Sequence, residues 1–236
     1  MTAHDHSQAE ATGGTVEETP TPFVHNDGQL MPLTARGEAT RRRILDAAEA
    51  VFGELGYYEA SITEITRRAG VAQGTFYIYF HTKRDVFVEL VEDLGKSFRQ
   101  ATRTGMEGAT DRLEAERRGF AAFFEFAMVH RHIYTIVQEA ERFAPEAAQA
   151  YYQGISRGYA RGLRAAMEAG QIRSMDPEAL AYALMGIGHF VALRWIIWPQ
   201  EGGETTEGAP PLPEEVFNTV IEFMMHGLAK PADEGK

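Results

Sequence analysis

From Glu38 onward, apolar residues recur every three or four positions, which is the period of an α-helix. The first periodic run ends before Gly56, because glycine commonly terminates helices. Its apolar positions are Ile44, Leu45, Ala48, Val51, Phe52 and Leu55. Ser61-Ile-Thr-Glu64 then has the spacing of a capping box, in which the serine hydroxyl and the glutamate carboxylate each satisfy a free backbone amide. It predicts a short helix that ends at Ala69-Gly70.

A second short helix is expected over residues 72–80, and Thr82 with Asp85 repeats the capping signature at the start of a long helix through Phe98. Further helices are predicted over residues 108–130, 131–142, 145–170, 176–198 and 213–229. A loop rich in glycine and proline is predicted from Pro199 to Pro213. No stretch shows the alternating apolar and polar pattern of a β-strand. We therefore expect an all-α fold, with a three-helix domain at 36–84 and a larger helical domain at 85–230.

Residues 1–35 lack this period and are rich in Thr, Glu, Gly and Pro, so they are predicted to form a disordered acidic tail. They contain five acidic residues and no Lys or Arg, in a chain of 236 residues with a net charge of −11. Residues 36–84 instead hold eight basic residues against six acidic ones, a net charge of +2. This basic segment indicates a surface for an anion, or a chance cluster in a short window.

Several classes of function are excluded by what the sequence lacks. Without cysteine there are no disulfides and no thiolate zinc sites. No glycine-rich phosphate loop, zinc-ligand spacing or nucleophile elbow occurs, so we expect no enzyme, no catalytic or metal-binding residues and no cofactor. The N-terminus does not resemble a secretory signal, and no uninterrupted apolar run reaches the roughly 18 residues of a membrane span. We expect a cytoplasmic protein without a membrane partner.

The stretch GVAQGTFYIYFHTK, residues 70–83, places four aromatic residues within five positions. On a helix Phe76 and Phe80 form one ridge, which is expected to pack inward against Phe52 and Ile65. The residues expected on the outer side are Gly74, Tyr77, Ile78 and Tyr79. Because glycine has no Cβ, Gly74 would let this helix approach another surface closely.

A capped helix, a glycine turn and a second short helix predict a helix-turn-helix, whose second helix enters the major groove of DNA. Gln73 can read a base by paired hydrogen bonds, and Thr75 can bind phosphate or touch a thymine methyl. Hydroxyl groups and a lysine in this region would bind phosphates. The predicted DNA-contact residues are Thr63, Gln73, Gly74, Thr75, Tyr77, Tyr79 and Lys83. The arginines at 41–43 are interpreted either as lying near phosphate or as a solvated basic patch.

The segment TRRRILDAAEAVFGELGYYEASITEITRRAGVAQGTFYIYFHTKRDVF, residues 40–87, resembles the DNA-binding region of the TetR (tetracycline repressor) family of bacterial transcriptional regulators. The strongest part is AGVAQGTFYIYFHTK. The resemblance implies a homodimer that binds a double-stranded DNA operator through the residues named above. It also implies that the C-terminal helices bind a small-molecule effector and that the last two pair with a second copy. Two departures are Thr66, where alanine is usual, and Ile78-Tyr79, where basic residues or histidine are common.

The C-terminal half carries candidate effector contacts. Residues 119–137 hold more aromatic surface than one helical stripe needs, so they form either a core or a cavity wall. Gly154, Gly158 and Gly162 share one helix face and indicate a groove for another helix or an extended ligand. The arginines at 157, 161 and 164 form a solvated or ion-paired stripe, or a site for anionic ligand groups. The predicted ligand-binding residues are Phe124, Met128, Tyr134, Tyr152, Gly158, Arg161, His189 and Arg194.

The segments IVQEAERFAPE and LMGIGHFVALRWIIW are similar to a branch of the TetR family that responds to fatty acyl-CoA. We therefore expect a ligand-responsive repressor that is released from its operator by a small apolar or acyl-type effector. The alternative is a DNA-binding regulator without such an effector, whose C-terminal domain serves only dimerisation or a protein partner.

Overall fold

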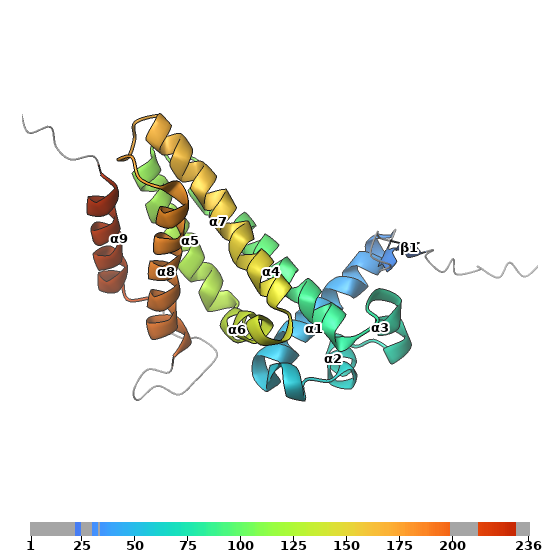
Figure 1. Cartoon of the computed structure of the whole chain (residues 1–236). Helices are drawn as coiled ribbons and strands as arrows, with labels where there is room; N and C mark the ends of the chain where they lie inside the picture. The colour runs from blue at the N-terminus through green and yellow to red at the C-terminus, as the bar shows by residue number, and fades with distance from the viewer. Residues whose placement is uncertain (1–21, 25–29, 33, 199–211, 230–236) are drawn as a thin grey trace, which may run out of the picture.

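The computed structural model describes residues 22–24, 30–32, 34–198 and 212–229. Within these ranges the chain is almost entirely helical, as predicted (Figure 1). Its long elements are α1 (Ala35–Glu59), α4 (Lys83–Met106), α5 (Arg112–Val129), α7 (Pro145–Glu168), α8 (Pro177–Ala192) and α9 (Glu214–Leu228). The shorter ones are α2 (Ile62–Ala69), α3 (Gln73–Tyr79), α6 (Ile133–Phe143) and a π-helical turn η1 (Leu193–Ile197) that continues α8.

The predicted disorder of residues 1–35 is wrong where the structure describes them. Strands β1 (Pro22–Val24) and β2 (Leu30–Pro32) pair in an antiparallel hairpin, with Phe23 opposite Met31. The Thr34 hydroxyl then accepts a hydrogen bond from the amide of Gly37, so α1 begins at Ala35. The rest of the predicted tail lies outside the described residues.

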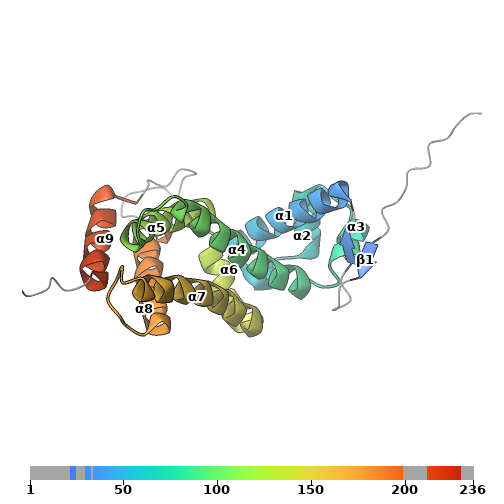
Figure 2. The ribbon, with the colours of Figure 1, turned by 90° about the horizontal axis from the view of Figure 1, so that it is seen from above.

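Two hydrophobic cores run through the described helices. The first is shared by α1, α2, α3, the first half of α4, the end of α5, α6 and the start of α7. The second joins α5, α7, α8 and α9. Figures 1 and 2 show the two parts at opposite ends of an elongated molecule, with α4 running between them. Since α6 belongs to the first core and packs on both α1 and α7, it connects the two ends.

Helix α1 is bent near its C-terminal end. Gly56 has a φ of +74°, a conformation that glycine adopts without strain and other residues rarely adopt. The sequence placed the helix end at this glycine, but the chain resumes a helical turn beyond it, up to Glu59. The bend turns the last residues of α1 toward α4 and α6.

One described segment, Pro177–Ile197, is long and apolar enough to cross a membrane by length and composition alone. The search for uninterrupted apolar runs in the sequence did not single it out. Core helices of soluble proteins meet the same criterion, and this segment packs against α5 and α7 in the helical bundle. Two of its aromatic residues, Tyr182 and Phe190, are exposed.

Candidate nucleic-acid interface and buried cavity

Local chemistry sets the angle between α2 and α3. The Ser61 hydroxyl caps α2 by accepting a hydrogen bond from the amide of Glu64 at 3.2 Å. At the other end Gly70 takes the left-handed conformation, with a φ of +64°, and its amide binds carbonyls in the last turn of α2. Both ends of α2 therefore lie where the sequence predicted them. Thr66, the departure from the family pattern, is buried and satisfies its hydroxyl on the carbonyl of Thr63 at 3.0 Å.

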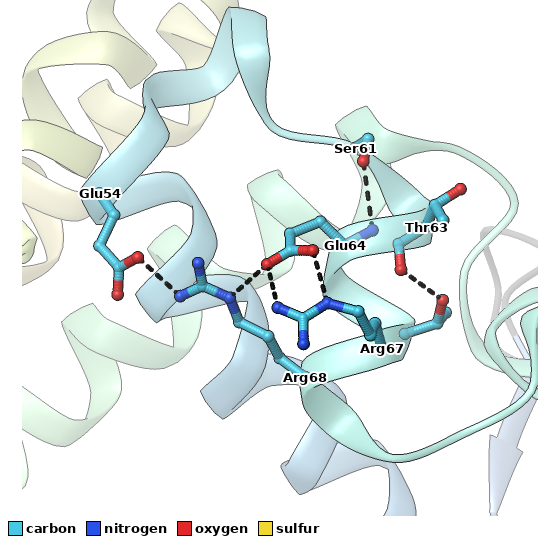
Figure 3. Close-up of polar contacts among 7 residues, drawn as sticks. Glu54, Ser61, Thr63, Glu64, Arg67 and Arg68 are labelled. Carbon is cyan, nitrogen blue, oxygen red and sulfur yellow. Dashed lines mark hydrogen bonds and ion pairs between the residues drawn. The ribbon is translucent and has the colours of Figure 1, made fainter.

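The carboxylate of Glu64 does not complete the predicted capping box. It accepts hydrogen bonds from both Arg67 and Arg68 instead, and Arg68 also pairs with Glu54 of α1 at 2.8 Å (Figure 3). Hydrogen bonds from Arg67 and then from Arg68 lower the pKa of Glu64 to about 2. These ion pairs attach α2 to α1. They also neutralise two of the eight basic residues of segment 36–84.

Helix α3 is divided into a buried edge and an exposed edge. Phe76 and Phe80 are fully buried in the first core together with Phe52 and Ile65, as predicted. On the outer edge Tyr77 is 50% exposed and Ile78 is exposed beside it. A methyl group at Gly74 would meet no heavy atom within 4 Å, so the backbone of α3 is open to an approaching surface there.

Gln73 and Thr63, both predicted DNA contacts, lie side by side on the exposed surface. The side-chain amide of Gln73 donates a hydrogen bond to the Thr63 hydroxyl at 2.8 Å. The two side chains come from different helices, so this bond holds the first residue of α3 against α2. Thr75 is half-buried on the neighbouring flank of α3.

The expected exposure of Tyr79 is wrong, because Tyr79 is only 9% exposed and belongs to the first core. On a helix it follows Phe76 by three residues, so it lies about 60° from Phe76, toward the buried side. Tyr77 follows Phe76 by one residue, about 100° away, and stays outside. The outer edge therefore presents one tyrosine rather than two.

Lys83 also departs from its predicted role. Its ammonium group donates hydrogen bonds to the carbonyls of Tyr57 at 2.8 Å, Tyr58 at 3.1 Å and Ala60 at 2.8 Å. A lysine ammonium has three donors, and these contacts use all of them. The expected free ammonium facing a phosphate is therefore replaced by a clamp on the bent end of α1. Lys83 and these carbonyls lie 23 to 26 residues apart in the sequence, so no local sequence pattern predicts the contact.

Two of the three neighbouring arginines of α1 form ion pairs rather than a free basic patch. Arg41 pairs with Glu89 of α4. Arg42 pairs with Asp93 of α4 at 2.6 Å and with Asp46 at 2.8 Å. Both arginines thus attach α1 to α4, which neither of the two interpretations drawn from the sequence included.

A cavity of about 980 Å3 lies among α4, α5, α6, α7 and α8. Its apolar wall includes Phe98, Phe120, Phe123, Phe126 and Leu184. The residues predicted to bind a ligand that do line it are Tyr134, Tyr152, Gly158, Arg161 and His189.

The other three predicted ligand residues, Phe124, Met128 and Arg194, are not among those that line this cavity. The ring of Phe124 is buried in the second core, 6.3 Å from that of Phe217 on α9. Met128 packs against the same core. The Arg194 guanidinium lies 5.5 Å from the ring centre of Trp195. Phe124 and Phe217 thus pack α5 against α9 rather than line the cavity.

One part of the cavity wall is polar and aromatic. Burial raises the pKa values of Tyr134 and Tyr151, and it raises that of Tyr152 to about 12. The ring of His189 lies 5.1 Å from that of Tyr134, and burial lowers its pKa, so its imidazole is neutral near pH 7. These groups can exchange hydrogen bonds with a bound polar group without a change of charge.

Buried charges in the cavity wall were missed from the sequence. The Arg112 guanidinium pairs with the Glu116 carboxylate at 2.5 Å, and Glu116 is only 2% exposed. The Tyr159 hydroxyl donates a hydrogen bond to the same carboxylate. A methyl group at Gly162 would lie 2.6 Å from Nη1 of Arg112, so this glycine makes room for the guanidinium. The glycine spacing on α7 signalled a close approach, but not by which residue.

Comparison with known proteins agrees with this geometry. The family model described as "Bacterial regulatory proteins, tetR family" matches residues 44–90, which include α2, α3 and the start of α4. A second, "Tetracyclin repressor-like, C-terminal domain", matches residues 113–234, about half of the chain. The chain belongs to the tetR family of bacterial transcriptional regulators. The helix-turn-helix interpretation of residues 61–79 and the all-α fold are thereby confirmed.

Individual bacterial regulators align along most of the chain. The uncharacterised transcriptional regulator YhgD of Bacillus subtilis is 26% identical over 194 residues, which cover 80% of this chain and 96% of YhgD. The fatty acid degradation regulator FadR of Bacillus halodurans has a similar structure, with a TM-score of 0.66 at 23% identity over 79% of this chain and 98% of FadR. FadR of Bacillus subtilis, solved in complex with stearoyl-CoA, gives a TM-score of 0.64 at 20% identity, with 79% and 98% covered.

Proposed function

We propose that the protein is a cytoplasmic repressor that binds operator DNA through α3 and leaves it when a small effector occupies the cavity. The observation that carries the DNA-binding part is the division of α3. Its phenylalanines are anchored in the core, while Gln73, Gly74 and Tyr77 form an exposed edge with open space at the glycine. Such an edge can enter the major groove, with Gln73 at a base and Tyr77 at a phosphate.

For the effector we propose an acyl compound with an anionic head, such as a long-chain fatty acyl-CoA. The cavity volume of about 980 Å3 and its phenylalanine wall suit a long apolar chain. The FadR proteins, one of them solved with stearoyl-CoA, have a similar fold. The alternative, a regulator without an effector, would be favoured by a solidly packed domain, whereas the cavity supports an effector.

Helix α6 is placed to carry the signal. Tyr134 and Val137 line the cavity, whereas Glu139 on the other side of α6 accepts a hydrogen bond from the amide of Tyr57 at 2.6 Å. Just before α6, His130 contacts Glu49 of α1 at 2.8 Å, and His132 packs against Gly53 so closely that a methyl group there would overlap the ring. A ligand that shifts α6 therefore shifts α1, and a coupling free energy of about 1–3 kcal/mol would change operator affinity about 5- to 150-fold.

The proposed function is tested by selecting DNA and then releasing it. We expect the purified chain to enrich, from a randomised duplex library, a palindromic site with half-sites about one helical turn apart. Fluorescence anisotropy of that site should then show weaker binding as stearoyl-CoA is added. Enrichment of no site would contradict the DNA-binding role, and binding unaffected by any acyl compound would contradict the acyl effector.

We further propose that α8 and α9 pair with those of a second copy. Phe190 on α8 is 67% exposed and Phe223 on α9 is 70% exposed, which is a large apolar surface for a chain on its own. Pairing would place two α3 helices on one operator, so that the second binding event becomes intramolecular.

Replacing both phenylalanines with glutamate should therefore give a monomer whose operator affinity is at least about a hundredfold weaker. Light scattering coupled to gel filtration would measure the mass, and anisotropy the affinity. Val129→Glu, on the exposed end of α5, is the matched control and should stay dimeric. A double variant that remains dimeric would show that the interface lies elsewhere.

A further inference from the structure

The cavity is richer in positive charge than its apolar wall suggests. Four arginines line it, at 99, 103, 112 and 161, against the two glutamates 116 and 141. Arg112 is neutralised by Glu116, as described above. In the part of the chain that the structure describes, the other three arginines have no carboxylate within ion-pair distance, and Arg103 only donates to the side-chain carbonyl of Gln100. Arg103 and Arg161 are exposed and Arg99 is half-buried, so in an acidic chain with a net charge of −11 this part of the cavity wall is locally basic.

The three arginines lie along the contact between α4 and α7. These helices lie side by side and run in the same direction, because Arg84 pairs with Glu146 near their starts and Arg99 lies over Gly154 further along. Arg103 follows Arg99 by about one turn of α4 and lines the same cavity, and the nearest atom to a methyl group at Gly158 of α7 would be Nη2 of Arg161 at 3.9 Å. We call Arg99, Arg103 and Arg161 the basic seam.

Two glycines of α7 shape this seam. A methyl group at Gly154 would lie 2.9 Å from Nη1 of Arg99, so that glycine admits the guanidinium. A methyl group at Gly158 would have only the 3.9 Å neighbour named above, so the helix backbone is uncovered between the arginines. Arg99 is half-buried beside Tyr151, and a cation that is partly removed from water without an anionic partner is destabilising. A bound anion would remove that penalty.

We propose that the basic seam binds the phosphate groups of the effector's head, while the acyl chain occupies the phenylalanine-lined part of the cavity. This inference rests on the proposed acyl effector and adds which residues bind the phosphates of its head. Residues 154 to 161 span about 10 Å along the axis of α7. One carboxylate cannot reach guanidinium groups spread over that length, whereas a head with several phosphates can, and guanidinium forks match phosphate oxygens in geometry.

Calorimetric titration of the full-length protein tests this proposal with ligands that share a stearoyl chain and differ in the head. Stearoyl-CoA carries three phosphates, stearoyl lysophosphatidate carries one, and S-stearoyl-pantetheine carries none. We expect affinity to fall in that order. Arg99→Gln and Arg103→Gln should each weaken stearoyl-CoA at least about tenfold, as expected for a lost charge-assisted hydrogen bond, and should leave S-stearoyl-pantetheine unchanged.

Arg157→Gln is the matched control, because Arg157 is an exposed arginine of α7 that does not line the cavity, and it should change neither affinity. Thermal melting must show that the variants fold. Arg99→Lys keeps the positive charge, so it should retain more affinity for stearoyl-CoA than Arg99→Gln. Equal affinity of the wild type for stearoyl-CoA and S-stearoyl-pantetheine, or stearoyl-CoA binding unaffected in both glutamine variants, would overturn the basic seam while leaving the acyl effector intact. Failure of all stearoyl compounds to bind would instead overturn the acyl effector itself, and the basic seam with it.

Discussion

Arg112→Met is expected to lower the free energy of unfolding by about 3–5 kcal/mol, which is the usual effect of removing one member of a buried ion pair. Methionine fills much of the same volume, so the loss comes from charge rather than from a cavity. Glu116, at 2% exposure, would be left with only the Tyr159 hydroxyl as a partner. Chemical denaturation followed by circular dichroism would measure the change.

The double variant Arg112→Met with Glu116→Gln separates this explanation from simple loss of packing. Glutamine removes the buried charge but keeps a side-chain carbonyl that can accept the Tyr159 hydrogen bond. We expect the double variant to recover at least half of the stability lost in Arg112→Met, since neutral replacement of a whole buried pair is often tolerated. A double variant as unstable as the single one would mean that the arginine acts through packing alone.

The helices of this protein could be predicted from the sequence because they depend on local signals. In the Thr82–Asp85 capping box both hydrogen bonds form: each side chain accepts from the backbone amide of the other residue. Gly70 ends α2 at the position predicted from the sequence. In the Ser61 box only the serine hydroxyl accepts its hydrogen bond, because the Glu64 carboxylate binds Arg67 and Arg68 of the same helix instead. A spacing rule identifies possible partners, but competition among them is decided in the folded chain.

The site could be predicted only where helical geometry or local sequence sufficed. The inward ridge of Phe76 and Phe80 was correct, but Tyr79 was assigned to the wrong side of a helix only seven residues long. Lys83 binds carbonyls more than 20 residues away, and Arg99 reaches a glycine 55 residues away. Contacts of this kind depend on how helices pack, so no local pattern reports them.

Gly74→Val should weaken operator binding without weakening the fold. In the described structure no atom outside the backbone of α3 itself lies within 4 Å of a new Cβ at Gly74, so the added side chain begins in open space. Valine is also a slightly better helix former than glycine, by a few tenths of a kcal/mol. On DNA the added methyl groups would hold α3 away from the groove, at about a tenfold loss per half-site and about a hundredfold loss for a dimer.

Ala150→Val is the matched control, because it adds valine methyl groups at an exposed position of α7, outside the helix-turn-helix. It should bind the operator as the wild type does. Gly74→Val should melt at or slightly above the temperature of the wild type, and Ala150→Val slightly below it, because valine is a better helix former than glycine and a poorer one than alanine.

The central claim is that the outer edge of α3 enters the duplex, and the affinity of Gly74→Val for the selected operator tests it most directly. Measured by anisotropy at one fixed salt concentration, it should be about a hundredfold weaker than that of the wild type, with a melting temperature no lower than that of the wild type. An affinity equal to that of the wild type would contradict the claim, because α3 could not then lie against DNA at its most open point.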